Sequence, residues 1–260
     1  MEHFSEGLSH GVEHLLHELS VLPAFGGEGS QFVLTQYMFF LLVAFALTFV
    51  FMAVAARKAS LVPKGISNLA EVGVEFVRDS VVVDVMGEEG KKYFPFVATV
   101  FFFILFNNLL GLIPGFKPGT GTMGSTVTWA VMVFILYNAI GIKKHGPIKY
   151  FLSFVPGGTP KALAPFIWLL EFISHIVRPL TLSVRLFANM FAGHVILGIF
   201  ALFTVLFFEM SGALKVVGVL PLVLQIAMYA FEVFVAFIQA YVFTILTAVY
   251  IGGALHADEH

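Results

Sequence analysis

Apolar and polar positions along this chain separate into long apolar blocks divided by short polar segments. A helix needs about 20 apolar residues to cross a bilayer, and the chain contains five blocks that approach or exceed this length. In chain order they are Phe32–Ala56, Tyr93–Ile113, Val127–Ile142, Pro165–Phe208 and Val216–Ile251. This pattern predicts five spanning helices.

The last two blocks are longer than one crossing requires. At 1.5 Å per residue, Pro165–Phe208 would be a helix of about 65 Å, whereas the hydrocarbon core is about 30 Å thick. Either these helices are strongly tilted, or each breaks into two pieces, and one re-entrant break would move the C-terminus to the other side. Pro179 could kink the fourth block. Neither block has a polar turn cluster near its middle, so we expect two long, tilted helices.

Between the first two blocks, the segment Ile66–Met86 alternates polar and apolar residues at helical spacing. Its polar positions are Asn68, Glu71, Glu75, Arg78 and Asp79. Such a pattern is typical of an amphipathic helix that lies in the membrane interface. We therefore predict an all-α membrane protein with five transmembrane helices and one interfacial helix. Residues 31–260 form a single transmembrane domain.

Residues 1–30 differ from this domain. They carry Glu but no Lys or Arg, unlike a signal peptide, and we expect an extracytoplasmic segment with a short amphipathic helix over about residues 3–19. His10, His14 and His17 share one face of that helix. A metal site is one interpretation, but no strong ligand set completes it, so a solvated face is favoured and no metal is expected.

Composition supports a lipid environment and excludes several functions. Of 260 residues, 59% are hydrophobic and 12% charged, against about 25% charged in soluble domains. The chain has no cysteine, which excludes disulfides and thiolate chemistry. Its net charge of −2 gives no sign of nucleic-acid binding.

Lys and Arg are distributed unequally between the two sides of the predicted topology. One side carries Arg57, Lys58, Lys64, Arg78, Lys91, Lys92, Lys143, Lys144, Lys149 and Lys161, and the other carries Lys117 and Lys215. Basic loops remain cytoplasmic. We therefore expect the N-terminus outside and the C-terminus in the cytoplasm.

Polar residues inside the spans form stripes, and ionisable groups at membrane depth are usually functional. At about 100° per residue, five residues of the fourth block lie within about 80° of one another, and three residues of the fifth recur every seven positions. The first stripe is Glu171, His175, Arg178, Arg185 and Asn189, and the second is Gln225, Glu232 and Gln239. His194, nine residues after Arg185, falls on the opposite face of its helix.

Arg185 needs an anionic partner, because it stays protonated and its burial in the bilayer is costly. One candidate is an intrachain salt bridge with Glu232. The other is a carboxylate on another subunit, for which the small neighbours Ala188, Ala192 and Gly193 leave room. His194 and Glu232 form a second candidate pair, either a structural contact or a proton relay. Amide side chains in the spans either line water or form hydrogen bonds between helices.

Three motifs carry a family resemblance. The segment Arg185–His194 (RLFANMFAGH) resembles the arginine motif of subunit a of F-type ATP synthases. The segment Glu232–Phe243 (EVFVAFIQAYVF) resembles the last helix of that subunit, and Asn107–Pro114 (NNLLGLIP) resembles its second span. Many bacterial members of this family have Glu at the position of His194 and His at the position of Glu232. The arrangement in this chain is that of mitochondrial-type members.

The resemblance implies a non-catalytic, proton-conducting stator subunit without a cofactor, in the bacterial inner membrane. Its implied partners are a ring of c subunits, b-type peripheral stalk subunits and the remaining ATP synthase subunits. The essential arginine of the family corresponds to Arg185, which would separate two half-channels. The outer half-channel would contain Asn189, His194, Glu232 and Gln239, with Asn108 contributing. Glu171 matches a carboxylate of the cytoplasmic half-channel. His175, on the same stripe, is a further candidate for proton translocation.

Two other classes are less consistent with the sequence. A self-contained ion-coupled secondary transporter is expected to have inverted repeats, and no repeat is apparent. An intramembrane protease would need a Ser/His pair or two aspartates inside the spans, and no Asp lies within a span.

Overall fold

The computed structural model describes residues 7–13, 23–25, 34–57, 65–155, 159–160, 162–210 and 214–257. Within these ranges, five helices are long and apolar enough to cross a membrane. They are α2 (Gln36–Arg57), α5 (Phe94–Gly111), α6 (Met123–His145), α8 (Ala164–Glu209) and α10 (Val219–Leu255). The five apolar blocks are thereby confirmed, and the chain is a multi-pass membrane protein of the predicted all-α class.

Short elements connect the long helices. They are α3 (Ile66–Val77), the π-helix η1 (Arg78–Val83), α4 (Asp84–Met86), the 3-10 helices η2 (Glu88–Tyr93) and η3 (Gly119–Gly121), α7 (Pro147–Leu152) and α9 (Leu214–Val217). Residues 7–13 are helical and fall inside the predicted N-terminal helix, whose remainder lies outside the described residues. The sequence did not predict the two short antiparallel strands β1 (Pro23–Phe25) and β2 (Leu34–Thr35).

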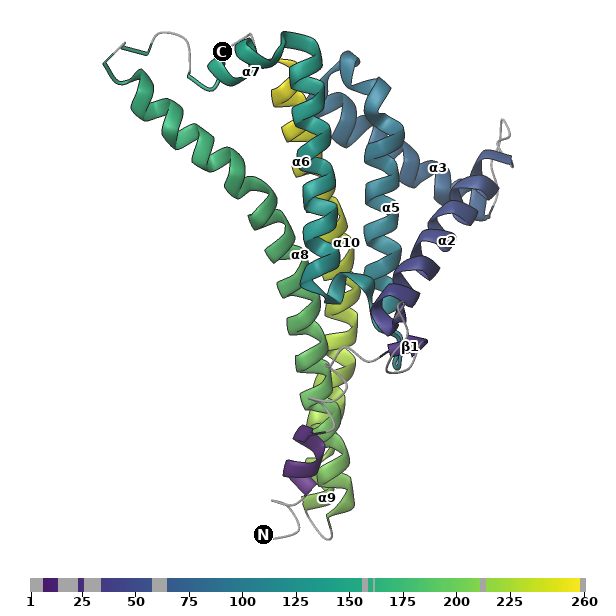
Figure 1. Cartoon of the computed structure of the whole chain (residues 1–260). Coiled ribbons are helices and arrows are strands. Elements are labelled where there is room, and N and C mark those ends of the chain that lie inside the picture. The colour runs from purple at the N-terminus through teal and green to yellow at the C-terminus, as the bar shows by residue number, and fades with distance from the viewer. Residues whose placement is uncertain are drawn as a thin grey trace.

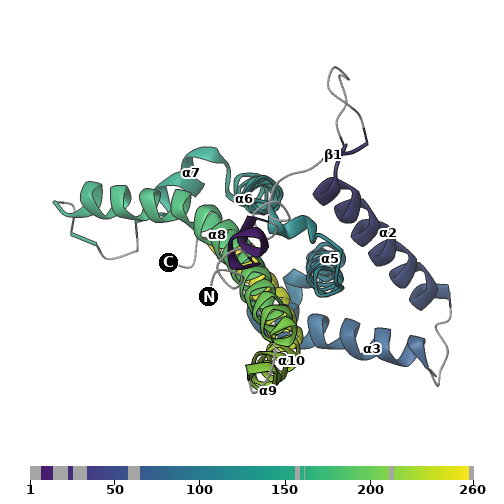
Figure 2. The ribbon, with the colours of Figure 1, turned by 90° about the horizontal axis from the view of Figure 1, so that it is seen from below.

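The predicted interfacial segment forms one helical run from α3 through η1 to α4. Its polar side chains Glu71, Glu75 and Asp79 are exposed, whereas Val77 and Val81 are buried. In Figure 2, α5 and α6 are seen nearly end-on while α3 is seen along its length. The amphipathic run therefore lies across the spanning helices, as an interfacial helix does.

Helix α5 is the centre of the bundle. Its side chains Phe101, Phe103 and Ile104 are almost completely buried, and the helix packs against α2, α3 and α10. In contrast, α2 is mostly exposed on its apolar outer side. An exposed apolar surface of this kind is stable only in contact with lipid or another membrane protein.

The two C-terminal helices are continuous, which confirms tilt rather than breakage. Helix α8 has 46 residues and α10 has 37, so at 1.5 Å per residue they are about 69 and 56 Å long. Pro179 lies inside α8 without ending it. Figure 1 shows α8 and α10 side by side toward α9, whereas toward α7 the helix α8 leans away from the bundle.

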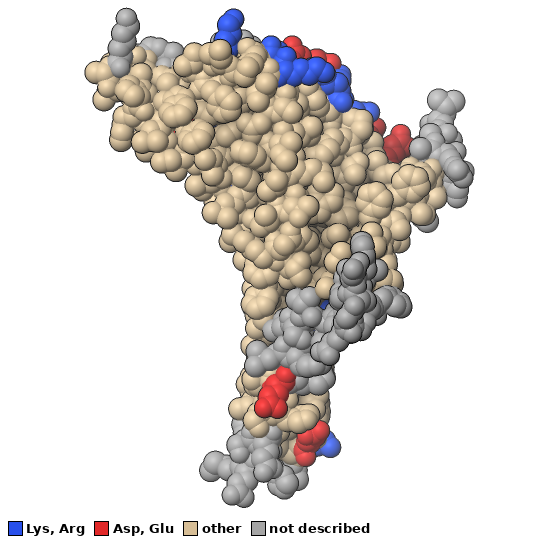
Figure 3. All heavy atoms as spheres, in the orientation of Figure 1, with Lys and Arg blue, Asp and Glu red and all other residues tan. Residues whose placement is uncertain are grey.

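The two ends of the molecule differ in charge. Lys and Arg gather around η2, the end of α6 and α7, and the middle of the face shown in Figure 3 is a broad belt with almost no charged side chains. Lys144 at the end of α6 forms a 2.7 Å ion pair with Glu89 of η2. Residues 7–13 and α9 lie at the opposite end (Figure 1). This arrangement matches an odd number of crossings.

Candidate functional site

Arg185 lies on the outer surface of α8. Its side chain is exposed, as are those of Ala188 and Ala192 on the following turns. In the part of the chain that the structure describes, no carboxylate lies within ion-pair distance of Arg185. The salt bridge to Glu232, one of the two candidates, is not formed. The guanidinium therefore faces outward from a strip of small and apolar side chains.

The rest of α8 shows why Arg185 and His194 have different surroundings. The buried face of the helix carries Leu182, Leu186 and Met190. At about 100° per residue, this face lies between the directions of Arg185 and His194. Asn189, next to the buried face, is half-buried. The predicted opposition of Arg185 and His194 is therefore present, one pointing out of the subunit and the other lining a cavity.

Glu232 lies on α10, and its side chain packs against α8. Its side chain is only 5% exposed, and a Cβ built on Gly193 would overlap its carboxyl group. The absence of a side chain at Gly193 thus provides the space that the carboxyl group fills. The neighbouring His194 bonds through Nδ1 to the carbonyl oxygen of Met190 at 2.9 Å. Among the described residues, no hydrogen bond or ion pair joins His194 directly to Glu232.

Two amides of α5 fix the loop that leads to α6. The Oδ1 atom of Asn107 accepts a hydrogen bond from the Gly119 backbone N–H at 2.9 Å. The Oδ1 atom of Asn108 accepts one from the Thr120 hydroxyl at 3.0 Å. Both side chains are completely buried. These contacts agree with the structural interpretation of the amides, at least for their oxygen atoms.

The nitrogen atoms of several amides indicate a second role. The buried side-chain nitrogens of Asn107, Asn108, Asn189 and Gln239 have no hydrogen-bond partner among the described residues. They belong to α5, α8 and α10, and α10 packs against both other helices. Buried donors are costly to leave unpaired, and water is a partner that can satisfy such groups.

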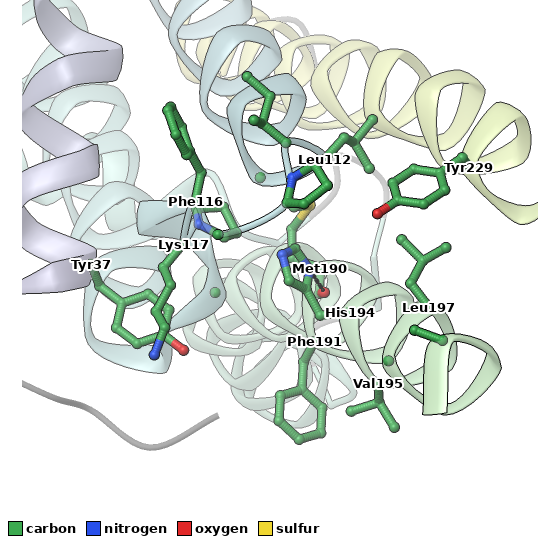
Figure 4. Close-up of a pocket in the computed structure, with 18 of the residues that line it drawn as sticks. Tyr37, Leu112, Phe116, Lys117, Met190, Phe191, His194, Val195, Leu197 and Tyr229 are labelled. Carbon is green, nitrogen blue, oxygen red and sulfur yellow. Dashed lines mark hydrogen bonds between the residues drawn. The ribbon is translucent and has the colours of Figure 1, made fainter. Parts of the chain in front are cut away.

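The structure also contains a cavity of about 400 Å³. It lies among the start of α2, the α5–α6 loop, α8 and α10 (Figure 4). Its polar lining consists of Tyr37, Lys117, His194, Gln225 and Tyr229. Ile113 and Phe116 of the loop, which also line it, are exposed. The cavity therefore connects the molecular surface to the helix face that carries His194.

A second polar group lies nearer the basic end of the molecule. The Nη2 atom of Arg178 donates a hydrogen bond to Oε1 of Glu171 at 2.6 Å, and its guanidinium lies 5.6 Å from the centre of the Tyr250 ring. The side chains of Arg178 and Glu171 are 35% and 41% exposed. The contact of Arg178 with Tyr250 thus links the diverging part of α8 to α10 at a partly open position.

His175 belongs to the same stripe in sequence but is buried, with 4% of its surface exposed. Its Nε2 atom lies 2.9 Å from Oδ1 of Asn138 on α6, and the Asn138 amide donates to the Phe134 carbonyl oxygen at 2.7 Å. Aromatic rings, including that of Tyr150, surround the imidazole. Burial raises the pKa of Tyr150 to about 12, so its phenol remains neutral.

Sequence reasoning did not find every polar group of these sites. Tyr37 and Tyr229 were not singled out, because tyrosine is common in membrane helices and only the folded chain places both in the wall of one cavity. The Glu171–Arg178 ion pair was also missed, although seven residues are nearly two helical turns and place both on one face. In the described ranges, no group of three or more His, Asp or Glu side chains is arranged for a metal ion. His14 and His17 lie outside these ranges.

Known proteins resemble this chain over most of its length. Residues 37–252 match the family model described as "ATP synthase A chain". ATP synthase subunit a of Gluconacetobacter diazotrophicus is 40% identical over 240 residues, which cover 92% of this chain and 96% of that protein. The subunit a proteins of Acidiphilium cryptum and of a Nocardioides species are 42% and 43% identical, over 93% and 92% of this chain and 96% and 91% of their own length. With an outward-facing arginine on α8, a buried glutamate on α10 and this likeness, the chain belongs to the ATP synthase A chain family.

Proposed function

We propose that this chain is the proton-conducting stator subunit of a rotary ATP synthase. The observation that carries the proposal is the position of Arg185, which is exposed and has no carboxylate partner among the described residues. A permanently charged group on an apolar face of a membrane protein requires an anionic partner from outside the subunit. A carboxylate of a c-subunit ring is such a partner.

The proposed mechanism depends on the cost of charge in hydrocarbon. A ring carboxylate can face lipid only in its neutral form, because an ionised carboxylate there is too costly. Next to Arg185 the ionised form is favoured, so the proton leaves. Rotation then brings the carboxylate to the other half-channel, where it is protonated again. A membrane potential of 100 mV contributes about 2.3 kcal/mol for each proton that crosses.

The outer half-channel contains the cavity and the buried polar groups beside it. His194 lines the cavity, and Glu232 lies against Gly193, the residue before His194. Gln239, Asn189 and Asn108 have buried amide nitrogens that water can pair. Protons enter through the cavity, pass His194 and Glu232, and reach the ring near Asn189.

The cytoplasmic half-channel lies on the other side of Arg185. Glu171 is partly exposed there, so its carboxylate can accept protons that leave the ring. His175 is buried and bonded to Asn138, and it acts by fixing α6 against α8 beside this exit. Arg185 separates the two half-channels, and protons cross only when the ring turns.

The orientation follows from the basic end of the molecule (Figure 3). In the topology predicted from the sequence, ten of the 14 Lys and Arg residues belong to segments on that side, and only Lys117 and Lys215 belong to segments on the other. Basic segments remain in the cytoplasm. In a bacterial inner membrane the N-terminus is therefore outside and the C-terminus inside, and the cavity opens outward.

The chain works as part of the ATP synthase complex, with the c ring and b-type stalk subunits as its neighbours. It supplies no catalytic group and needs no cofactor, since nucleotide chemistry takes place in other subunits. Purification in mild detergent tests this assignment against a secondary transporter. A stator subunit is recovered with a c ring and stalk subunits, whereas recovery of the chain alone would support the transporter.

A further inference from the structure

Two residues of α10 line the cavity and lead toward Glu232. Gln225 and Tyr229 are both in the cavity wall, and they precede Glu232 by seven and three residues. These spacings place the three side chains on one face of the helix. With a rise of 1.5 Å per residue, Tyr229 lies about 4.5 Å from Glu232 along the helix axis. Tyr229 is thus the last cavity-lining residue of α10 before the buried carboxyl group.

His194 lines the same cavity from α8, across from Tyr229. Figure 4 shows Tyr229 reaching from α10 toward the side where His194 and Met190 enter from α8. The Glu232 carboxyl group packs against Gly193, which directly precedes His194 in the sequence. Tyr229 is half-buried, whereas Glu232 is 5% exposed. The phenol therefore lies in the cavity wall, about one helical turn from the buried acid.

The chemistry of the cavity wall explains what a phenol adds there. The described lining residues include no Asp or Glu, and most of the wall is apolar. Protons cross such a space along hydrogen-bonded water, which needs polar groups on the wall to hold it in place. A tyrosine hydroxyl both donates and accepts a hydrogen bond. It can accept from one water molecule and donate to the next.

We propose that Tyr229 is a positioning residue of the outer half-channel, whose hydroxyl orders the water that connects the cavity with His194 and Glu232. This inference rests on the proposed function of the chain as a proton-conducting subunit. Tyr229 acts in the entry of protons from outside and has no role in their release to the cytoplasm.

The test compares two tyrosines of the same helix in the intact ATP synthase, reconstituted in lipid vesicles. Tyr229→Phe removes the hydroxyl and keeps the ring. Tyr241→Phe is the matched control, because Tyr241 packs against the Phe76 ring at 5.6 Å and is not in the cavity wall. The rate of ATP synthesis is measured against the pH of the compartment that faces the α5–α6 loop, at constant membrane potential.

We expect Tyr229→Phe to lower the rate at neutral pH about fivefold, the factor that corresponds to about 1 kcal/mol for one hydrogen bond. The loss should diminish as that compartment is acidified, because a higher proton concentration compensates for slow entry. The pH dependence on the cytoplasmic side should not change, and Tyr241→Phe should behave as the unaltered enzyme. A purely structural role of Tyr229 would lower the rate equally at every pH.

The outcomes separate this inference from the proposed function. If Tyr229→Phe has the unaltered rate at all pH values while Arg185→Ala abolishes synthesis, Tyr229 has no such role and the proposed function stands. If Arg185→Ala synthesises ATP normally, the proposed function itself fails.

A second measurement asks whether water reaches the site, and it covers the case in which Tyr229→Phe fails to assemble. The chain contains no cysteine, so Tyr229→Cys introduces a single thiol. Silver ions added to the compartment facing the cavity should inhibit Tyr229→Cys and leave Tyr241→Cys active. Resistance of Tyr229→Cys to silver would overturn the inference.

Discussion

Replacing Gly193 with alanine should slow proton entry at Glu232 while the complex still assembles. A Cβ at this position would overlap the Glu232 carboxyl group, which is 5% exposed and enclosed between α8 and α10. To restore ordinary van der Waals contact, the carboxyl group must move by roughly 1 Å. A displacement of about 1 Å at a proton-transfer site can lower a rate about 100-fold.

The cost in stability should be smaller than the loss of flux. Overpacking of a buried site costs about 1–3 kcal/mol, which a large membrane complex tolerates. Gly253→Ala is the matched control, because Gly253 likewise lies inside a long helix, α10, and a Cβ there meets nothing within 4 Å. Gly193→Ala combined with Glu232→Asp should recover part of the flux, since aspartate is shorter by one methylene group.

The assay is proton uptake into vesicles through the membrane sector, with the membrane potential clamped by potassium and valinomycin. Gly193→Ala should show a strongly reduced rate, Gly253→Ala an unaltered one, and the double variant an intermediate one. Normal flux through Gly193→Ala would refute the reasoning, because it would mean that the position of the Glu232 carboxyl group does not matter for proton entry.

Three further outcomes follow from the geometry. An impermeant thiol reagent applied to intact cells should label Ser5→Cys and not Ala257→Cys, and the reverse pattern would contradict the orientation. The exchange of His194→Glu with Glu232→His should carry more proton flux than either single variant, because it keeps one acid and one base beside each other; if it is no better than the worse single variant, the residues are not coupled. Asn138→Ala removes the partner of a buried imidazole and should destabilise the subunit by about 1–3 kcal/mol, measured as a lower thermal inactivation temperature, and an unchanged temperature would argue against that contact.

The sequence predicts the spanning helices well because their apolar length is a local property. The blocks Phe32–Ala56 and Val127–Ile142 correspond to α2 and α6, with ends that shift by no more than four residues. The absence of a polar turn cluster correctly indicated that α8 continues through Pro179. A proline costs one hydrogen bond and a steric clash, which a long helix in a membrane can accommodate by bending.

The surroundings of each polar side chain were less predictable. Helical periodicity placed His175 and Arg185 on one stripe, yet His175 is buried and Arg185 is exposed. The reason is tertiary, because His175 meets Asn138 of α6 and the ring of Tyr150 of α7, whereas Arg185 lies on the outer surface of α8. The π-helix Arg78–Val83 also carries no sequence signal that separates it from an α-helix.

The cavity shows the same limit of sequence reasoning. Its polar lining comes from α2, the α5–α6 loop, α8 and α10, which are far apart in the sequence. Gln225 was recognised through its spacing from Glu232, whereas Tyr37 belongs to a different helix and has no spacing that relates it to the others. Proximity between distant helices depends on packing, and a single sequence does not specify it.

The most direct test is ATP synthesis by vesicles that contain the intact complex with Arg185 replaced. Arg185→Ala should abolish proton-driven synthesis, and Arg185→Lys should fail largely, because an ammonium group can lose its proton in a low-dielectric site and lacks the planar guanidinium. Both variants should still copurify with the ring, since Arg185 is one residue of a larger exposed face. Synthesis by Arg185→Lys at the unaltered rate would contradict the proposal that Arg185 separates the two half-channels.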